Sequence, residues 1–275
     1  IDWMWANKAV FDANGISVPT TWDEVNAAAE KLKAAGIIPF AHGGQAWQDA
    51  TVFEAVAMGI GGNNYYKNCY VDLKESCLRS ETTVKVFDQM RKLQSYTDEG
   101  SPGRDWNVAT GMVIEGKAGF QIMGDWAKGE FTAAGKVPGV DYYCSPTPSN
   151  NGYLYNVDSF IFYKTSDPDK QEGQKLLAKL MMGKNFQKVF NLYKGSIPAR
   201  LDVPMDEFDK CAKTSNSDIK TAGASGGLVP SFAHGMAQGN TMKAALQDII
   251  TEHFNSDMSS VDAANALADS VLANM

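Results

Sequence analysis

The sequence lacks several features that mark common classes of function. It has no cluster of Lys and Arg, and its 275 residues carry a net charge of −7. Nucleic acid and anionic membranes are therefore poor candidates as main partners. No apolar run approaches the roughly 20 residues that a membrane-spanning helix requires. No Walker or dinucleotide-binding glycine pattern occurs, and we expect no cofactor.

Histidine is scarce, with three residues in the chain. His42, His234 and His253 are not spaced as ligands on one helix, so we expect no metal site. His253 lies near the end of a predicted helix, where contact with the helix dipole explains it. His234 stands on a loop flanked by proline and glycine, just before a predicted helix. A loop histidine of this kind is a candidate for ligand contact.

Cysteine is also scarce, and none of the four forms a C-x-x-C pair. Cys69 and Cys77 bracket a short polar segment that a disulfide would close. Cys144 and Cys211 would then form a long-range bridge. An even number of cysteines fits an oxidising compartment, and four buried free thiols are the alternative.

What the sequence does contain is typical of a globular protein with a large core, at 44% hydrophobic and 21% charged residues. Its patterns predict an α/β fold whose last third is nearly all helical. Thr21 and Glu24 form a capping box that starts a helix. The predicted strands are 37–40, 118–123, 140–144 and 153–163, with a further strand running into a short helix within 1–11. The other predicted helices are 52–58, 81–96, 106–115, 167–182, 186–193, 205–213, 236–254 and 261–272. A glycine- and asparagine-rich turn is predicted at 59–64.

The rest of the chain is organised around residues 116–130. A buried strand there stops at Gly124 and turns into a helix, for which Asp125 is the predicted N-cap. Trp126 then lies between the carboxyl end of a strand and the start of a helix, where open α/β sheets place ligands. The alternative is that Trp126 belongs to the core, as most large aromatic residues do.

Three other features carry weaker signals. Residues 223–227 (GASGG) match the G-x-S-x-G nucleophile pattern, but no buried strand precedes them, so we interpret Ser225 as part of a flexible loop. Asp158 interrupts an apolar run, and a carboxylate there must be paired or face a ligand. Lys194 lies where a predicted helix breaks, and the alternative to a role in binding is that it is an ordinary solvated cation. No carboxylate pair indicates a glycosidase.

A set of polar and aromatic residues from distant loops remains. Flat aromatic rings stack on sugar rings, while amide and charged groups hydrogen-bond to hydroxyls. The set therefore fits a neutral polyhydroxylated ligand better than an anion. It comprises Gln45, Trp47, Trp126, Asn156, Asp158, Lys194 and His234.

Five segments together resemble the family 1 extracellular solute-binding proteins of ABC importers, and among them the glucose/monosaccharide-binding members. The first segment, PTTWDE, is common to the broad family. The segments containing GDW, NVDSF and KGSIP are more specific to the glucose-type branch. The segments are 19–24, 42–49, 116–130, 156–160 and 194–200.

The resemblance implies a non-enzymatic protein with a type II periplasmic-binding-protein-like α/β fold, in which two lobes close on a monosaccharide. It also implies ABC permease subunits as partners and a periplasmic or extracellular location. Trp126 would stack on or line the cleft, and Cys144 would pair with Cys211. The hydroxyl-binding residues would be Asn156, Asp158, Lys194 and His234. The cleft edge would carry His42, Gln45 and Trp47.

The sequence differs from the family that it resembles in one respect, because members of that family have a further amino-terminal segment. Residues 1–146 and 194–275 are interpreted as a carboxy-terminal lobe, and 147–193 as a remnant of the amino-terminal lobe. Such a remnant would expose apolar faces, which a homodimer would cover. Without the missing part, sugar affinity would be weak or lost. The alternative function is a scaffold or interaction module that no longer serves transport.

Overall fold

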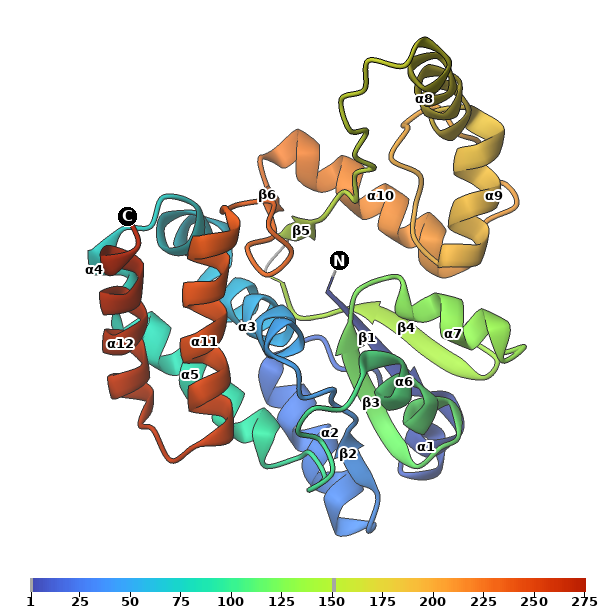
Figure 1. Ribbon diagram of the computed structural model, residues 1–275. Helices are drawn as coiled ribbons and strands as arrows, with labels where there is room; N and C mark the ends of the chain where they lie inside the picture. The colour runs from blue at the N-terminus through green and yellow to red at the C-terminus, as the bar shows by residue number, and fades with distance from the viewer. Residues whose placement is uncertain (1, 150–151) are drawn as a thin grey trace.

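The computed structural model describes residues 2–149 and 152–275. These residues form one four-stranded sheet, one two-stranded sheet and a large helical part (Figure 1). The strands are β1 (Trp3–Asn7), β2 (Ile38–Phe40), β3 (Ala118–Met123), β4 (Tyr142–Pro146), β5 (Tyr153–Tyr155) and β6 (Leu228–Pro230). The helices of the first half are α1 (Lys8–Ala13), α2 (Trp22–Ala34), α3 (Ala46–Tyr66), the π-helix η1 (Lys67–Val71), α4 (Glu75–Leu78), α5 (Glu81–Gln94), α6 (Trp106–Ile114) and α7 (Ala127–Ala133). Those of the second half are α8 (Pro168–Met181), α9 (Lys184–Lys194), α10 (Lys210–Ser225), α11 (Asn240–Asn255) and α12 (Ser260–Ala273).

The main sheet has the strand order β2-β3-β1-β4 and separates two hydrophobic cores. β1 is antiparallel to both β3 and β4, whereas β2 is parallel to β3. Successive side chains of a strand point to opposite faces. Met4 and Ala6 therefore join the larger core with α2, α3, α5, α11 and α12. Trp3 and Trp5 join the smaller core with α6 and α7.

Several predicted elements are confirmed because local sequence determines them. The Thr21 side chain accepts from the Glu24 backbone, and the Glu24 carboxylate accepts from the Thr21 backbone, so the capping box is present. The first strand passes directly into α1, and β2 and β3 lie where they were expected. The last third of the described chain is mostly helical, as predicted.

The predicted turn at 59–64 is confirmed in part, as a kink inside α3, which continues on the other side to Tyr66. Gly62 has a left-handed backbone (φ 73°) and marks a break inside the helix. A Cβ at Gly59 would lie 2.1 Å from the Trp22 indole nitrogen. This glycine therefore permits close packing of α3 against α2, rather than signalling a loop.

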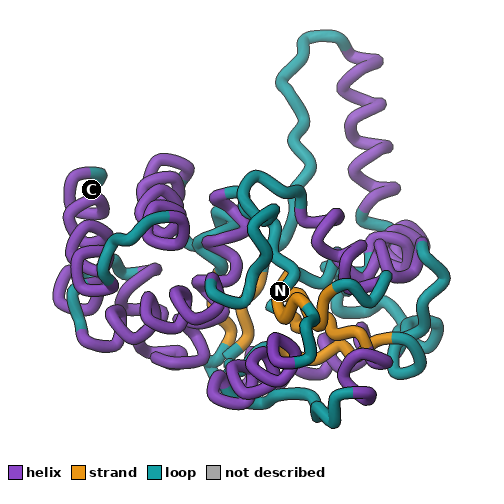
Figure 2. The backbone as a smooth tube through the Cα atoms, turned by 90° about the horizontal axis from the view of Figure 1, so that it is seen from below, coloured by secondary structure: helices purple, strands orange, loops and turns teal. Residues whose placement is uncertain are grey.

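The predicted strand 153–163 is also too long. β5 ends at Tyr155 and pairs in parallel with β6. Residues 156–165 then form an exposed segment without strand structure. In Figure 2 this loop and α8 project away from the rest of the chain.

Asp125 is not the N-cap of the helix after β3. α7 begins at Ala127 with Trp126 in the capping position, and no side chain caps it. The Asp125 carboxylate instead accepts a hydrogen bond of 2.8 Å from the Ser196 hydroxyl, on the segment after α9. A tertiary contact thus replaces the local cap.

The predicted loop at 223–227 is partly wrong as well. Ser225 is the last residue of α10, and Gly226 follows it with a left-handed backbone. The Ser225 hydroxyl donates to the Ala222 carbonyl at 3.2 Å. It therefore has the partner of an ordinary helix-terminal serine.

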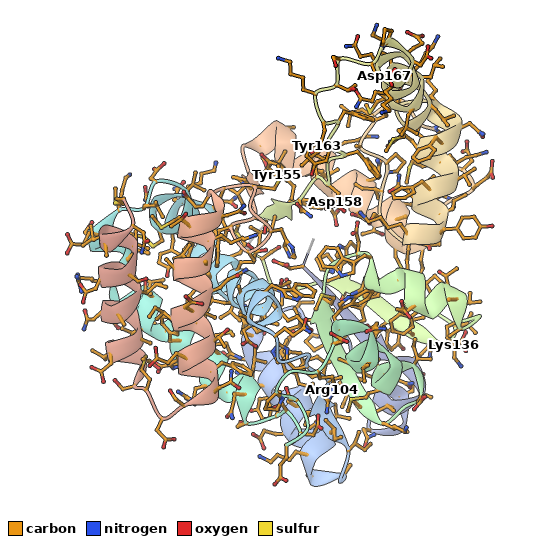
Figure 3. All side chains as sticks on the ribbon, in the orientation of Figure 1. Arg104, Lys136, Tyr155, Asp158, Tyr163 and Asp167 are labelled. Carbon is orange, nitrogen blue, oxygen red and sulfur yellow. A yellow bond between two sulfur atoms is a disulfide. The ribbon has the colours of Figure 1, made fainter. Side chains whose placement is uncertain are left out.

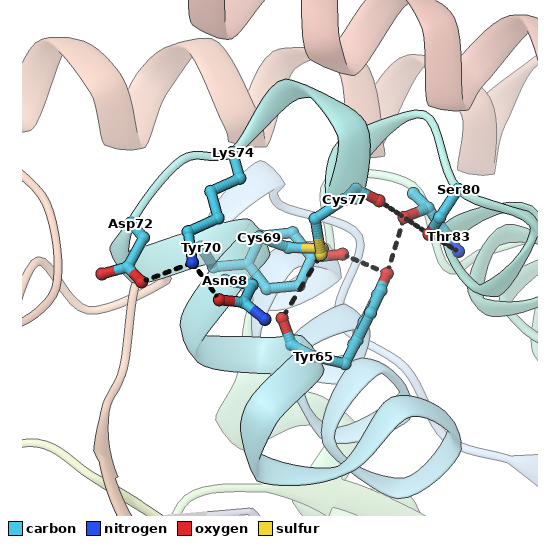
Figure 4. The surroundings of a disulfide bond; sticks show 9 residues. All are labelled: Tyr65, Asn68, Cys69, Tyr70, Asp72, Lys74, Cys77, Ser80 and Thr83. Atoms are coloured by element: carbon cyan, nitrogen blue, oxygen red, sulfur yellow. Dashed lines mark hydrogen bonds and ion pairs between the residues drawn. A yellow bond between two sulfur atoms is a disulfide. The ribbon is translucent and has the colours of Figure 1, made fainter.

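Both expected disulfides are present. Cys69 pairs with Cys77 beside η1, where Figure 4 also shows the Tyr65 hydroxyl bound to Thr83. Cys144 of β4 pairs with Cys211 of α10 and ties the edge of the sheet to that helix. Across the described residues, no helix is long and apolar enough to cross a membrane.

Candidate functional site

Two tryptophan rings flank the imidazole of His234. The ring centroid of Trp126 lies 5.1 Å from that of His234, and the centroid of Trp47 lies 6.0 Å from it. Both rings meet the imidazole edge to face. Burial lowers the pKa of His234 to about 4, so the imidazole is neutral at physiological pH. A neutral imidazole offers one donor and one acceptor nitrogen.

Thr51 determines which nitrogen of His234 donates. The Thr51 hydroxyl lies 2.8 Å from the Trp47 carbonyl, to which it donates, and 3.0 Å from Nε2 of His234. It therefore accepts from Nε2–H, which leaves Nδ1 as the acceptor nitrogen of His234. Sequence reasoning missed Thr51. Its one signal was its position four residues after Trp47, one helical turn along α3.

Three separate elements supply these aromatic rings. Trp47 comes from the first turn of α3, and His234 from the loop between β6 and α11. Trp126 comes from the turn after β3, and its ring covers Gly124, where a Cβ would lie 2.1 Å from the indole. Gly124 is therefore required by the close approach of the Trp126 ring.

The indole nitrogen of Trp47 is already hydrogen-bonded. It donates to Oε1 of Gln45 at 2.8 Å, and the amide nitrogen of Gln45 donates to Asp105 at 2.6 Å. Gln45 thus orients Trp47 at the start of α3. The face of the Trp47 ring, and not its donor, is what this residue contributes to the site.

A second group of polar residues lies on the segment that leaves β5, where Figure 3 labels Asp158. The Lys194 ammonium, at the end of α9, forms an ion pair with Asp158, and the Asn156 amide donates to the same carboxylate at 3.2 Å. Burial acts to raise the pKa of Asp158, but Lys194 outweighs it, and the pKa is lowered. The Asp158 side chain is 63% exposed, so the pair is open to solvent.

The two groups lie within electrostatic reach of each other. The Asp158 carboxylate acts to raise the pKa of His234, and His234 acts to lower that of Asp158. The fold therefore brings together Trp47, Trp126, His234, Asn156, Asp158 and Lys194 from distant parts of the chain. Together they present two aromatic rings, one neutral imidazole and a charged pair.

His42 does not join this set. Its Nε2 lies 2.7 Å from Oδ1 of Asp49, its ring stacks on Phe40, and the residue is buried. Its imidazole therefore faces the core and is closed to solvent. The segment 42–47 is divided between core and site.

Two hollows lie away from the aromatic rings. One, of about 250 Å³, is lined by Asp2, Tyr153 and Asp218 among others. The other, of about 490 Å³, lies between α2 and α5 and includes Trp22 and Lys92. Neither hollow is lined by Trp47, Trp126, His234 or Asp158.

An apolar surface adjoins the charged pair, as the sequence predicted for residues 147–193. It lies on the segment after β5 and on α8 and α9. Its most exposed members are 60–81% exposed and include Phe160, Ile161, Tyr163, Leu176, Leu180 and Tyr193. Contiguous exposed apolar patches are typical of surfaces that contact another protein, a membrane or a ligand.

Comparison with known proteins identifies relatives over nearly the whole chain. A probable sugar-binding periplasmic protein of Brucella suis is 47% identical over 98% of this chain and 64% of its own length. One of Rhizobium meliloti is 45% identical over 98% of this chain and 65% of its own length. The chain thus spans just under two thirds of the length of these relatives.

Solved structures share the fold of this chain. A solved chitin oligosaccharide binding protein superposes with a TM-score of 0.80 over 99% of this chain and 69% of its own, at 20% identity. The structure therefore has the expected type II periplasmic-binding-protein-like α/β fold. The model of the bacterial extracellular solute-binding proteins matches residues 2–181. Because this match covers more than half of the sequence, the chain belongs to the family of bacterial extracellular solute-binding proteins.

Proposed function

We propose that this chain forms one side of the sugar-binding cleft of an ABC importer's solute-binding protein, and that its ligand is a glucose-like monosaccharide. Its location is periplasmic or extracellular, as the family's is. The protein acts by binding and not by catalysis, and it delivers the sugar to permease subunits in the membrane.

The observation that carries the proposal is the His234 imidazole held between Trp47 and Trp126, within electrostatic reach of Asp158. The aromatic rings supply apolar faces for the C–H side of a pyranose. Nδ1 of His234 accepts from a sugar hydroxyl, while Asp158 accepts and Lys194 donates. A neutral ligand suits this set, because Asp158 and Lys194 already neutralise each other.

The close spacing of the two tryptophan rings favours a single sugar ring. Both tryptophans contact one imidazole, and the short patch that they line matches the size of one pyranose. The related Brucella and Rhizobium proteins are named as sugar-binding, without a particular sugar.

We further propose that residues 1–146 and 194–275 belong to a carboxy-terminal lobe and 147–193 to the opposite lobe. The exposed apolar side chains of α8 and α9 support this division, because they lack the cover that a complete lobe provides. The uncovered cleft of this chain would then hold sugar weakly. In the alternative, a transport-inactive scaffold, the same residues would hold none.

The test is a glucose titration of the 275-residue chain, followed by tryptophan fluorescence and calorimetry. We expect a saturable response that Asp158→Ala reduces by about tenfold or more in affinity, since charge-assisted hydrogen bonds are worth roughly 1.5–3 kcal/mol. Asp169→Ala is the matched control, because Asp169 is an exposed carboxylate on α8. A folded chain without any response to glucose would favour the scaffold.

A further inference from the structure

Glu54 is a charged residue at the centre of the protein that no step of the proposed binding uses. It is fully buried on α3, one turn beyond Thr51 and two beyond Trp47. A buried carboxylate is costly unless its oxygens are hydrogen-bonded. Its partners therefore indicate why the fold retains it.

The Glu54 carboxylate accepts three hydrogen bonds. Oε1 accepts from the Ser231 hydroxyl at 2.6 Å, and Oε2 accepts from the Tyr66 hydroxyl at 2.9 Å and from the Ala233 backbone at 3.3 Å. Every partner is a donor, which suits an ionised carboxylate because it only accepts.

Both hydroxyls also accept hydrogen bonds from the backbone of residues in the same loop. The Tyr66 hydroxyl accepts from the backbone of Phe232 at 3.1 Å, and the Ser231 hydroxyl accepts from the backbone of His234 at 3.1 Å. Each residue from 231 to 234 is therefore linked to Glu54, either directly or through one hydroxyl. This loop is the one that carries the imidazole of the candidate site.

We propose that Glu54 is the positioning residue of the sugar site, whose ionised carboxylate fixes loop 231–234 so that His234 stays between Trp47 and Trp126. The expected effect of Glu54 on sugar affinity rests on the proposed function, whereas its effect on the order of the loop does not.

Protonation of Glu54 is expected to loosen the loop. Burial raises its pKa to about 7, while Ser231, Ala233 and Tyr66 act to lower it. The groups that face it are Tyr66 and Ser231, and also Asp2, whose buried carboxyl has a raised pKa. A protonated carboxyl must donate its own hydrogen among partners that all donate. When the loop opens on a packed α3, Glu54 stays buried but loses the donors Ser231 and Ala233, so its pKa rises further. By linkage, the ionised form therefore favours the ordered loop.

The first experiment follows amide hydrogen exchange at residues 232–234 in the 275-residue chain. We expect Glu54→Gln, which places an amide among donors, to speed exchange there by about tenfold or more at pH 8, as the loss of a charged hydrogen bond predicts. Wild-type exchange, corrected for its intrinsic pH dependence, is expected to rise as the pH falls through 7, whereas the variant shows no such change.

Asp49→Asn is the matched control. Asp49 is a second fully buried carboxylate on α3, but its partners are His42 and Thr251, not the loop. It is expected to lower the melting temperature without changing the pH profile of exchange at 232–234. Equal loop exchange in the wild type and Glu54→Gln, or the same pH profile in both, would overturn the proposal.

The second readout is the glucose dissociation constant between pH 6 and pH 8. We expect wild-type affinity to weaken toward pH 6 and the Glu54→Gln affinity to be weak throughout. If the wild type binds no glucose, the proposed function fails, and hydrogen exchange still decides the role of Glu54. If glucose binds with the same pH profile in both proteins, the positioning role fails alone.

Discussion

Burial holds two histidines of this chain neutral, but with different consequences. Nε2 of His234 bonds to Thr51, whereas neither nitrogen of His253 has a hydrogen-bond partner among the described residues. His253 packs its ring against Phe87, at 4.7 Å between centroids, and burial lowers its pKa to about 4. His253 is therefore a structural residue with two unsatisfied polar atoms.

His253→Leu is expected to reduce the loss of stability in acid. Below pH 6.5 the unfolded chain protonates this histidine, while the folded chain does so only near pH 4, so folding is weakened as the pH falls between these values. The full effect is on the order of 2–3 kcal/mol. Urea unfolding at pH 7 and pH 4.5 measures it. An unchanged difference between the two pH values in the variant would contradict the assignment.

Trp126→Ala is expected to weaken glucose binding by about tenfold, because specific packing of an aromatic ring is worth roughly 0.5–1.5 kcal/mol beyond the apolar area that it buries. Trp126→Phe keeps an apolar face and should restore most of the affinity. Trp22→Phe is the matched control, since Trp22 is a tryptophan buried between α2 and α3, away from His234. Calorimetric titration compares the three variants. Equal losses in Trp126→Ala and Trp22→Phe would refute the role of Trp126.

At the residue scale, local sequence patterns indicated candidate site residues but not the residues that support them. Asp158 stood out as a carboxylate in an apolar run, and Trp126 as an aromatic residue after a strand. Thr51 and Glu54 lie on a helix that looks uniformly buried, and their partners come from residues 231–234. Such long-range partners leave no local pattern. His42 was misjudged for the same reason, because Asp49 and Phe40 enclose it in the core.

At the scale of elements, local sequence patterns predicted the structure correctly where local hydrogen bonds determine it. They were misleading where long-range packing determines it. The Thr21–Glu24 capping box fixes the start of α2 by its own hydrogen bonds. The glycines at 59–62 predicted a turn; the backbone does break at Gly62, but Gly59 lies within α3 and permits its packing against α2. The apolar run 156–163 predicted a strand, yet it has no neighbouring strand to pair with, and a strand without a partner leaves its backbone unsatisfied.

The two disulfides connect elements over very different lengths of chain, 8 residues for Cys69–Cys77 and 67 for Cys144–Cys211. A disulfide stabilises the folded state by restricting the unfolded chain, and the effect grows with the length of the closed loop. It amounts to about 4 kcal/mol for Cys144–Cys211 and about 2.5 kcal/mol for Cys69–Cys77. We therefore expect Cys144→Ser with Cys211→Ser to lower the melting temperature more than Cys69→Ser with Cys77→Ser. Calorimetry of both double variants measures the difference. The reverse order would show that local packing around η1 outweighs the loop effect.

At the scale of the whole molecule, the apolar surface of α8 and α9 decides how the chain behaves on its own. The helix α8 packs on α9, and α9 packs on α7, while the opposite faces of α8 and α9 stay exposed. Apolar side chains at the tip of a projecting segment are not stable against association in water. A further segment of polypeptide or a second copy of the chain would bury these side chains equally well.

The 275-residue chain is therefore expected to self-associate at micromolar concentration. Ile161→Asp combined with Leu180→Asp places two charges on the exposed surface and should shift the chain to a monomer without lowering its melting temperature, because neither side chain is buried. Light scattering and calorimetry measure the two effects. Lys175→Asp is the matched control, since it changes charge on the same helix at a solvated residue. A wild-type monomer would show that the exposed surface needs no cover, and a dimer that survives both aspartates would place the contact elsewhere.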